Sequence, residues 1–376
     1  MPALRHDIDP DGLMEFSVVF TDRSLNHMSA AFQGVMRDIS SILKEVYNAD
    51  AVALIPGGGT YAMEAVARQL AEDETAMVIR NGWFSYRWSQ IFEVARLPAE
   101  EHVMMARRVG NDAQSPFQPA PVDEVVARIG REKPAAVFAP HVETASGMIL
   151  PDEYIAKVAE AVHAEGGLFV LDCIASGCAW VDMKALGVDV LISAPQKGWS
   201  ASPSAGMVML SERAIAVVKA RQSSSFAVDL GKWLSIMEAY ESGGHAYHAT
   251  MPTDALRAFR DTMVETKAYG FDRLRDAQWE QGNRVRALLA EKGFRSVAAE
   301  GFGAPGVVVS YTGDAEIQSG RAFLKEGLQI AAGVPLQVGE GDDYQSFRIG
   351  LFGLDKLMDV DASVARLEAA LEQVSG

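Results

Sequence analysis

Cysteine is scarce in this chain, with only Cys173 and Cys178 among 376 residues. Two thiols cannot build the disulfide framework of a small secreted domain, and their spacing differs from the Cys-x-x-Cys of zinc and redox sites. Both are therefore expected to be small, inert packing residues. The sequence predicts no metal site and a reducing compartment, of which the cytoplasm is the simplest.

Long apolar runs and an excess of basic charge are missing as well. No apolar stretch reaches the roughly 18–20 residues that a membrane helix needs, and the residues after Met1 lack the apolar core of a signal peptide. There are 34 basic against 50 acidic residues, a formal net charge of −16. Nucleic acid and anionic membranes repel such a protein, so neither is expected as a partner.

The composition that is present is typical of a soluble globular protein, with 49% apolar and 22% charged residues. The first two thirds alternate short apolar runs with helical periodicity, as at 26–48, 60–70 and 152–165. The predicted strands are 51–55, 76–80, 135–140, 168–171, 188–192 and 205–210. Such alternation predicts an α/β fold with a mainly parallel sheet covered by helices on both faces.

The pattern changes at about Thr253. Helical periodicity then runs from 254 to 292, followed by predicted strands at 307–311 and 345–349 and helices at 316–326 and 361–373. A chain of this length suits more than one core. We therefore predict a large domain over residues 1–252, including an N-terminal segment, and a smaller α+β domain over 253–376.

Lys197 is the most informative single residue. It lies in the loop Ser193-Ala194-Pro195-Gln196-Lys197-Gly198-Trp199, directly after a buried strand. Lysine is costly to bury unless it is paired or chemically used. A desolvated amine loses its proton more readily, so it can form a Schiff base with an aldehyde and later act as a base.

Asp172 ends the strand that precedes the lysine strand. A carboxylate beneath a pyridine nitrogen keeps that nitrogen protonated, and a protonated ring withdraws electrons from the bond to be broken. Since the carboxyl ends of parallel strands share one edge of a sheet, Asp172 and Lys197 together predict a pyridoxal phosphate site. A helix cap or a solvated acid is the plainer interpretation of Asp172 alone.

Two further segments follow strand ends at the same edge. Gly57-Gly58-Gly59-Thr60 precedes a helix and has the form of a phosphate cradle. A plain turn capped by Thr60 is an equal alternative, and the Gly-Lys-Ser/Thr of a nucleotide loop is absent. Phe84 follows another strand and could stack on a cofactor ring, although Trp83 competes for that role and core packing is common for phenylalanine.

Other candidates are weaker on their own. Thr144 has a hydroxyl that could reach the cofactor's phenolic oxygen, and we prefer it to His141. Tyr247 and Thr250 could present hydroxyls to a phosphate or belong to an ordinary loop. Arg348 lies inside an apolar strand, where arginine usually meets a carboxylate in a bidentate pair. An internal salt bridge is its alternative.

Taken in order, these segments resemble the class V aminotransferases of PLP fold type I, especially the alanine–glyoxylate and serine–pyruvate aminotransferase group. The resemblance spans about residues 50–355. The matching motifs are Gly57-Gly58-Gly59-Thr60 with Glu64-Ala65, Asn81-Gly82-Trp83-Phe84-Ser85-Tyr86-Arg87, His141-Val142-Glu143-Thr144-Ala145-Ser146-Gly147, Asp172-Cys173-Ile174-Ala175-Ser176, Gln196-Lys197, Tyr247-His248-Ala249-Thr250-Met251-Pro252 and Phe347-Arg348-Ile349-Gly350-Leu351.

The resemblance implies an enzyme that moves an amino group from a small amino acid to a 2-oxo acid such as glyoxylate or pyruvate. Lys197 would carry the cofactor and Asp172 would pair with its ring nitrogen. The remaining implied roles are the phosphate for Gly58, Gly59, Thr60 and Gln196, the ring face for Phe84, the ring oxygen side for Thr144, and the substrate carboxylate for Arg348. Tyr247 and Thr250 would reach the phosphate in a neighbouring subunit, which implies a homodimer with shared active sites.

Two departures from the family pattern leave the amino donor open. Many relatives begin with a Gly-Pro-rich segment, whereas this chain has Glu15-Phe16-Ser17-Val18-Val19-Phe20 and then Asn26-His27-Met28. Pro195 and Trp199 also flank the Gln-Lys pair unusually. The alternatives are a PLP-dependent lyase of the same fold acting on a small amino acid or aminophosphonate, a non-catalytic PLP-fold module, and, least favoured, a nucleotide-binding α/β protein.

Overall fold

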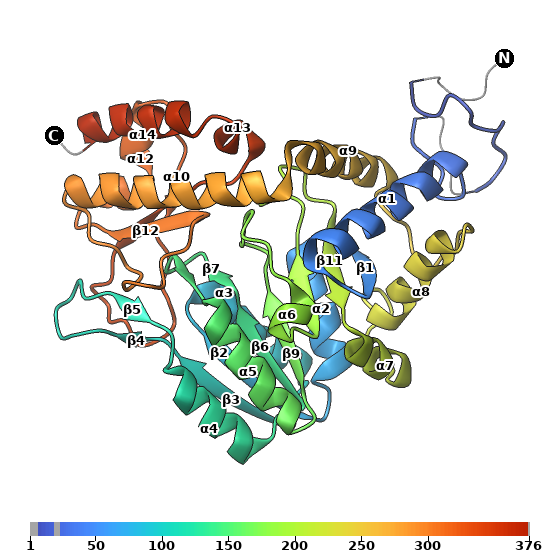
Figure 1. The fold of residues 1–376 in the computed structure, drawn as a ribbon, viewed down its shortest axis with the longest axis horizontal. Coiled ribbons are helices and arrows are strands. Elements are labelled where there is room, and N and C mark those ends of the chain that lie inside the picture. The colour runs from blue at the N-terminus through green and yellow to red at the C-terminus, as the bar shows by residue number, and fades with distance from the viewer. Residues whose placement is uncertain (1–6, 19–22, 375–376) are drawn as a thin grey trace.

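A seven-stranded sheet forms the centre of the computed structural model, which describes residues 7–18 and 23–374 (Figure 1). Its strands are ordered β1-β11-β10-β9-β6-β2-β3. Their bounds are β1 (Ala51–Pro56), β2 (Thr75–Arg80), β3 (Glu100–Met105), β6 (Ala136–Pro140), β9 (Leu168–Asp172), β10 (Val190–Ser193) and β11 (Ala205–Leu210).

The sheet is mainly parallel, which confirms the predicted α/β class. Strands β3, β2, β6, β9 and β10 pair in parallel, and only β11 runs antiparallel to both of its neighbours, β10 and β1. The segments after β1, β2, β9 and β10 therefore emerge at one edge. In the β9–β10 pair, Ile192 lies opposite Asp172, which brings the lysine loop next to the aspartate.

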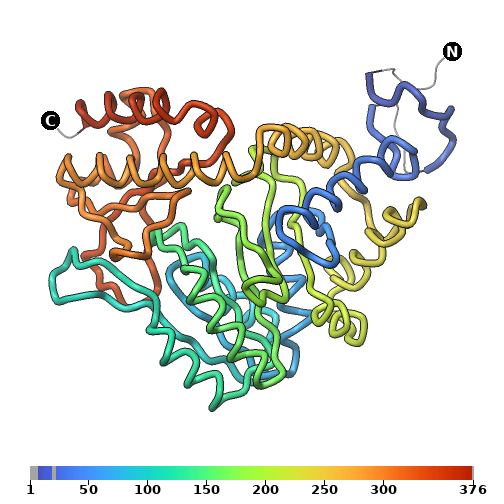
Figure 2. Tube along the Cα trace, viewed as in Figure 1, coloured from blue at the N-terminus to red at the C-terminus, as the bar shows by residue number. Residues whose placement is uncertain are grey.

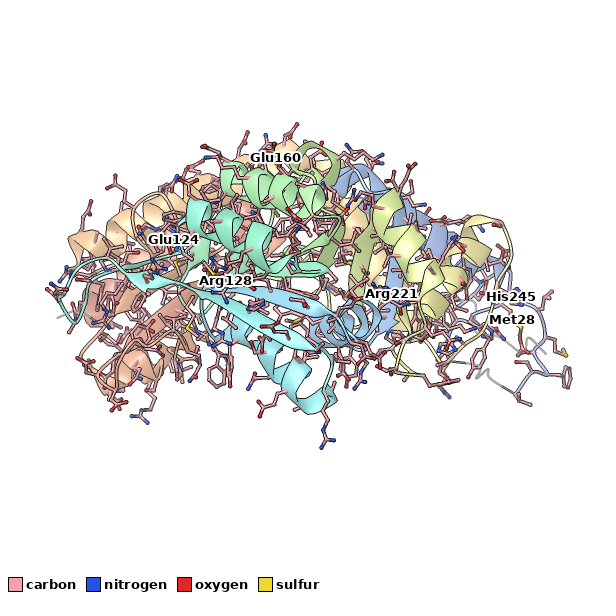
Figure 3. The ribbon with its side chains drawn as sticks, turned by 90° about the horizontal axis from the view of Figure 1, so that it is seen from below. Met28, Glu124, Arg128, Glu160, Arg221 and His245 are labelled. Atoms are coloured by element: carbon pink, nitrogen blue, oxygen red, sulfur yellow. The ribbon has the colours of Figure 1, made fainter. Side chains whose placement is uncertain are left out.

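Helices cover both faces, as the continuous burial of the central strands requires. On one side lie α4 (Val122–Glu132) and α5 (Asp152–Ala164), and on the other α3 (Trp83–Ala95) with α2 (Gly59–Leu70) beside it (Figure 3). Further elements of this part of the chain are α1 (Ala30–Tyr47), β4 (Arg107–Arg108), β5 (Phe117–Gln118), β7 (Val142–Glu143), β8 (Met148–Ile149), α6 (Met183–Leu186), α7 (Glu212–Ala220) and α8 (Leu230–Glu241).

The helical stretch predicted over 254–292 is present, but it is divided into two helices. The chain forms α9 (Thr253–Tyr269) and α10 (Phe271–Glu291), separated by Gly270 with φ 107° (Figure 2). That backbone angle favours glycine and ends a right-handed helix. The helix predicted over 316–326 is likewise two short ones, α11 (Ala315–Gln318) and α12 (Arg321–Lys325), divided at Gly320 with φ 79°.

The C-terminal part carries its own three-stranded sheet, ordered β12-β14-β13. Its elements are β12 (Val307–Tyr311), β13 (Ala331–Ala332), β14 (Ser346–Gly350), α13 (Leu354–Leu357) and α14 (Val360–Val374). Helices α10 and α14 pack together beside this sheet at the end of the molecule away from α1 (Figure 1).

Three large apolar clusters form in the described residues: one around the large sheet, one in the C-terminal part, and one that joins β8 to β12. Phe259 and Met263 of α9 belong to the core of the large sheet, whereas Val285 of α10 packs with Phe347 and Leu371 in a separate C-terminal core. The division at residue 253 stays a prediction. No helix in the described ranges is long and apolar enough to cross a membrane.

Gly206 generates a testable prediction about the packing at the start of α2. A methyl group there would meet the side chain of Ala62 and lie 2.7 Å from the carbonyl oxygen of Gly58. Gly206→Ala should therefore lower the free energy of unfolding in chemical denaturation by about 1–3 kcal/mol. The matched control is Gly34→Ala within α1, where nothing lies within 4 Å; it should raise stability by up to about 1 kcal/mol. Equal effects of the two variants would contradict the crowding.

Candidate active site

A cavity of about 220 Å³ lies at the carboxyl edge of the large sheet. It gathers residues from segments far apart in the sequence, following β1, β2, β9 and β10. The predicted site residues that line it are Gly59, Thr60, Phe84, Thr144, Asp172, Gln196 and Lys197. At this edge of the sheet, a carboxyl group, an amine, an aromatic ring and the N-terminus of α2 therefore surround the same cavity.

Asp172 is the last residue of β9, and its side chain is buried. Burial raises the pKa of its carboxyl group from 3.8 to about 7. A hydrogen bond from the Ile174 N–H (2.9 Å) and the charge of Arg87 oppose this rise, and the charge of Glu143 adds to it. Because the ionised form lacks a close cation, a ligand that brings positive charge would be favoured there.

Lys197 lies in a loop that is fixed by packing on its carboxyl side. Gly198 lies against the backbone of Gly177, where a Cβ atom would collide with a carbonyl group. Trp199 is fully buried among aromatic rings, with Trp180 at 5.0 Å and Phe259 at 6.2 Å between centroids. The lysine itself is held at the cavity wall between these anchors and the end of β10.

The environment of Lys197 favours the neutral amine. Burial lowers the pKa of this amine, and the nearby charge of Arg348 lowers it further. The Nζ atom lies 5.3 Å from the centroid of the Phe352 ring. An amine whose ammonium form is disfavoured is a better nucleophile and base near neutral pH.

The glycine segment forms the start of α2. Gly58 is the N-cap, so the alternative of a helix capped by Thr60 is wrong. A Cβ atom on Gly59 would collide with the side chain of Ile174. Backbone N–H groups at a helix start attract anions. The Thr60 hydroxyl accepts a hydrogen bond of 3.0 Å from Nη1 of Arg87, which adds a cation at this end of the cavity.

Phe84 lies in the first turn of α3, and two arginines approach its ring. The guanidinium carbons of Arg87 and Arg348 lie 5.3 Å and 5.6 Å from the centroid of its ring. Arginines at this distance stabilise a fixed ring position through cation–π attraction. Trp83, its competitor, is not among the residues that line this cavity; both side chains pack against the same neighbouring apolar cluster, and the Trp83 ring contacts that of Tyr86.

Arg348 comes from β14 of the C-terminal sheet. Its Nε atom donates a hydrogen bond of 2.8 Å to the carbonyl of Ala332. Burial lowers the pKa of its guanidinium, and the charge of Glu143 opposes that effect. In the described part of the chain no carboxylate forms an ion pair with Arg348, so the alternative of an internal salt bridge finds no support.

Tyr247 and Thr250 do not lie at this cavity. They are exposed, their hydroxyl oxygens are 3.4 Å apart, and they line a different cavity together with His27 and Trp233. Their action on a neighbouring subunit stays a prediction. Of the N-terminal departure from the family pattern, Val19 and Phe20 lie outside the described residues.

Sequence reasoning gave no role to Arg87 or Glu143. Arg87 is three residues beyond Phe84, so helical spacing could have placed both on one face. Glu143 is a fully buried acid. It stands in the same motif as His141 and Thr144, which were the only two residues of that motif considered for a role. His141 is buried against the hydroxyl of Ser176, and burial lowers the pKa of its imidazole to about 4, which keeps it neutral.

Comparison with known proteins identifies the family. The model of the family described as Aminotransferase class-V matches residues 15–300. The "Soluble hydrogenase, small subunit" of Synechococcus sp. (strain PCC 6716) is 26% identical, over 93% of this chain and 88% of that protein. The 2-aminoethylphosphonate–pyruvate transaminase of Vibrio vulnificus (strain CMCP6) is 25% identical, over 85% and 83%. Alanine–glyoxylate aminotransferase 1 of Saccharomyces cerevisiae is 23% identical, over 88% and 86%.

Solved structures share the fold. Alanine–glyoxylate aminotransferase from Nostoc sp. superposes with a TM-score of 0.79 at 22% identity, covering 93% of this chain and 89% of that one. Ureidoglycine–glyoxylate aminotransferase from Bacillus subtilis gives 0.75 at 22% identity, covering 94% and 88%. With a family match that spans most of its length, this chain belongs to the class V aminotransferases, which are pyridoxal-phosphate-dependent enzymes of fold type I.

Proposed function

We propose that this protein transfers an amino group from a small amino acid to a 2-oxo acid such as pyruvate or glyoxylate. The observation that carries the proposal is the pairing of Lys197 and Asp172 on one cavity, with burial lowering the pKa of the amine and raising that of the carboxyl group. The names of several relatives, which use pyruvate or glyoxylate as acceptor, support it.

The residues of the cavity fit pyridoxal phosphate. Asp172 would face the ring nitrogen, since its buried carboxylate needs a positive partner. The start of α2 at Gly58, Gly59 and Thr60, with Gln196, would hold the phosphate. Phe84 would cover the ring face, and Thr144 would lie on the ring oxygen side. When bound, the cofactor supplies an aldehyde for the lysine and a ring that withdraws electrons from the substrate.

In this proposal the chain contributes a base and an anchor. The Nζ atom of Lys197 would take the proton from the α-carbon of the substrate, hold it as an ammonium group and deliver it to the carbon that carried the cofactor's aldehyde, and its lowered pKa favours this exchange. Arg348, free of any ion pair in the described residues, would bind the α-carboxylate through its planar donors. Fixing this carboxylate orients the α-carbon toward the lysine.

Assembly and location are part of the proposal. A homodimer would use the exposed hydroxyls of Tyr247 and Thr250 at the phosphate of the neighbouring subunit; their distance from the chain's own cavity supports this. A cytoplasmic location is supported by two cysteines that stay unpaired.

The lyase alternative is not favoured. A desulfurase-type lyase needs a reactive thiolate, whereas Cys173 and Cys178 are both buried. Burial raises the pKa of the Cys178 thiol to about 12 and that of Cys173 well above its ordinary value. A thiol with a raised pKa stays protonated, so neither cysteine supplies the thiolate nucleophile that such a lyase needs.

A single-turnover screen tests the proposed reaction. Cofactor-loaded protein is mixed with each of a panel of amino acids and aminophosphonates, and the 2-oxo product is quantified before and after pyruvate or glyoxylate is added. The proposal predicts one equivalent of oxo product per site, followed by conversion of the added acid to alanine or glycine. Release of ammonia, sulfide or pyruvate with no amino transfer would instead identify a lyase.

Arg348→Ala should raise KM for carboxylate substrates roughly 10- to 100-fold, because it removes charged hydrogen bonds worth about 1.5–3 kcal/mol. The affinity for the cofactor should change much less. Arg321→Ala serves as the matched control, since Arg321 also lies in the C-terminal part but pairs with Glu316 at the surface. An unchanged KM in the Arg348 variant would remove this residue from the substrate site.

Asp172→Asn should separate stability from function. The folded-state pKa of Asp172 is raised, so between pH 4 and 7 the unfolded chain releases a proton that the folded chain keeps. The cofactor-free wild type should thus lose stability as the pH rises through this window, by up to about 4 kcal/mol. The Asn variant should lack this loss yet bind pyridoxal phosphate more weakly. Parallel pH–stability curves in denaturation experiments would contradict the raised pKa.

A further inference from the structure

Glu143 is a buried carboxylate beside the proposed site. It ends β7, its exposed fraction is 0%, and its two oxygens accept four hydrogen bonds. The donors are the backbone N–H groups of Phe84 (3.2 Å), Ser85 (2.8 Å) and Ala145 (3.0 Å) and the hydroxyl of Ser85 (2.7 Å). An ionised group is tolerated inside a protein only when such donors replace water.

Three of these four donors belong to the first turn of α3. Glu143 therefore lies at the positive end of this helix, where a negative charge is stabilised. Gly82, directly before the helix, makes the approach possible: a Cβ atom there would lie 2.7 Å from Cγ of Glu143. The contact thus couples the β7 strand to the position and direction of the start of α3.

We propose that Glu143 is a positioning residue for the cofactor: by binding the backbone of Phe84 and Ser85, its carboxylate sets the orientation in which the Phe84 ring faces the cavity. This inference rests on the proposed function, because it assumes that Phe84 stacks on pyridoxal phosphate. Ring stacking depends on the plane and offset of the rings, so a helix start that shifts weakens the contact even when the ring is retained.

The charge of Glu143 supports the same conclusion. It raises the pKa of Asp172 and opposes the lowering of the pKa of Arg348 by burial. Glu143 is therefore close enough to act electrostatically on both of these groups. A carboxylate buried far from the cavity would not change the pKa values of Asp172 and Arg348.

The experiment compares cofactor affinity in cofactor-free protein by titrating pyridoxal phosphate and following tryptophan fluorescence. Glu143→Gln should weaken binding about tenfold, since the amide NH2 group faces donors where the carboxylate accepted. The matched control is Asp189→Asn. Asp189 is also buried and accepts from the Phe169 N–H (2.9 Å), but it lies at the amino end of β10. This control should lose stability and keep wild-type affinity.

A double-mutant cycle separates positioning from general damage. If Glu143 acts through the ring, Phe84→Ala and the double variant with Glu143→Gln should bind the cofactor equally weakly. If the two losses instead multiply, Glu143 acts by another route and the proposal fails. Should Glu143→Gln not fold, Ser85→Ala removes one of the four donors and is expected to weaken binding about threefold.

The outcomes distinguish this inference from the proposed function. A wild type that binds no pyridoxal phosphate would overturn the proposed function itself. A wild type that binds it, with Glu143→Gln and Ser85→Ala binding equally well, would overturn only the role of Glu143. A loss of affinity in Asp189→Asn as large as in Glu143→Gln would show that any buried carboxylate has this effect, and would also overturn that role.

Discussion

Desolvation of two ionisable groups is the constraint on which the site depends. The parallel β9–β10 pair brings Asp172 and the Lys197 loop together at one sheet edge, and burial disfavours the charged form of both. The unliganded chain therefore holds an acid that tends to keep its proton and an amine that tends to lose it. A ligand with a cationic ring and an electrophilic carbon relieves both costs, so the same burial that weakens the apoprotein selects the cofactor.

The remaining packing makes this arrangement rigid. Close backbone approaches at Gly198 and Gly206 and the buried Trp199 hold the lysine loop and the start of α2. Glu143 fixes the start of α3 in a similar way, through hydrogen bonds in place of packing. Arg348 belongs to the C-terminal sheet, and its guanidinium carbon lies 5.6 Å from the centroid of the Phe84 ring. In the proposed function, substrate recognition would therefore depend on how the C-terminal sheet is joined to the large sheet, whereas the proposed cofactor residues belong to the large sheet and its loops.

The sequence sufficed for six of the seven strands of the large sheet, because buried strands are short apolar runs. The edge strand β3 was missed, because it begins Glu100-Glu101-His102 and is only partly buried, so it forms no apolar run. Asp172 and Arg348 stood out because charges in apolar runs are rare, and Lys197 stood out because it lies in the loop directly after a buried strand. Their roles stay predictions. The break at Gly270 was not predicted, because the apolar periodicity continues across it and only the positive φ of Gly270 divides α9 from α10. Glu143 was missed because its hydrogen-bond donors Phe84 and Ser85 lie far from it in the sequence. Arg87 was missed although its helical spacing from Phe84 was visible in the sequence. The proposed role of Tyr247 and Thr250 involves a second chain, which one sequence does not describe.

The central claim is that Lys197 is the lysine that bonds the cofactor, and peptide mapping tests it most directly. The protein is loaded with pyridoxal phosphate, reduced with borohydride and digested, and the modified lysine is located by mass spectrometry. The account predicts one modified site, Lys197, and no stable modification of the Lys197→Ala variant. Modification of a different lysine, or none in the loaded wild type, would contradict it.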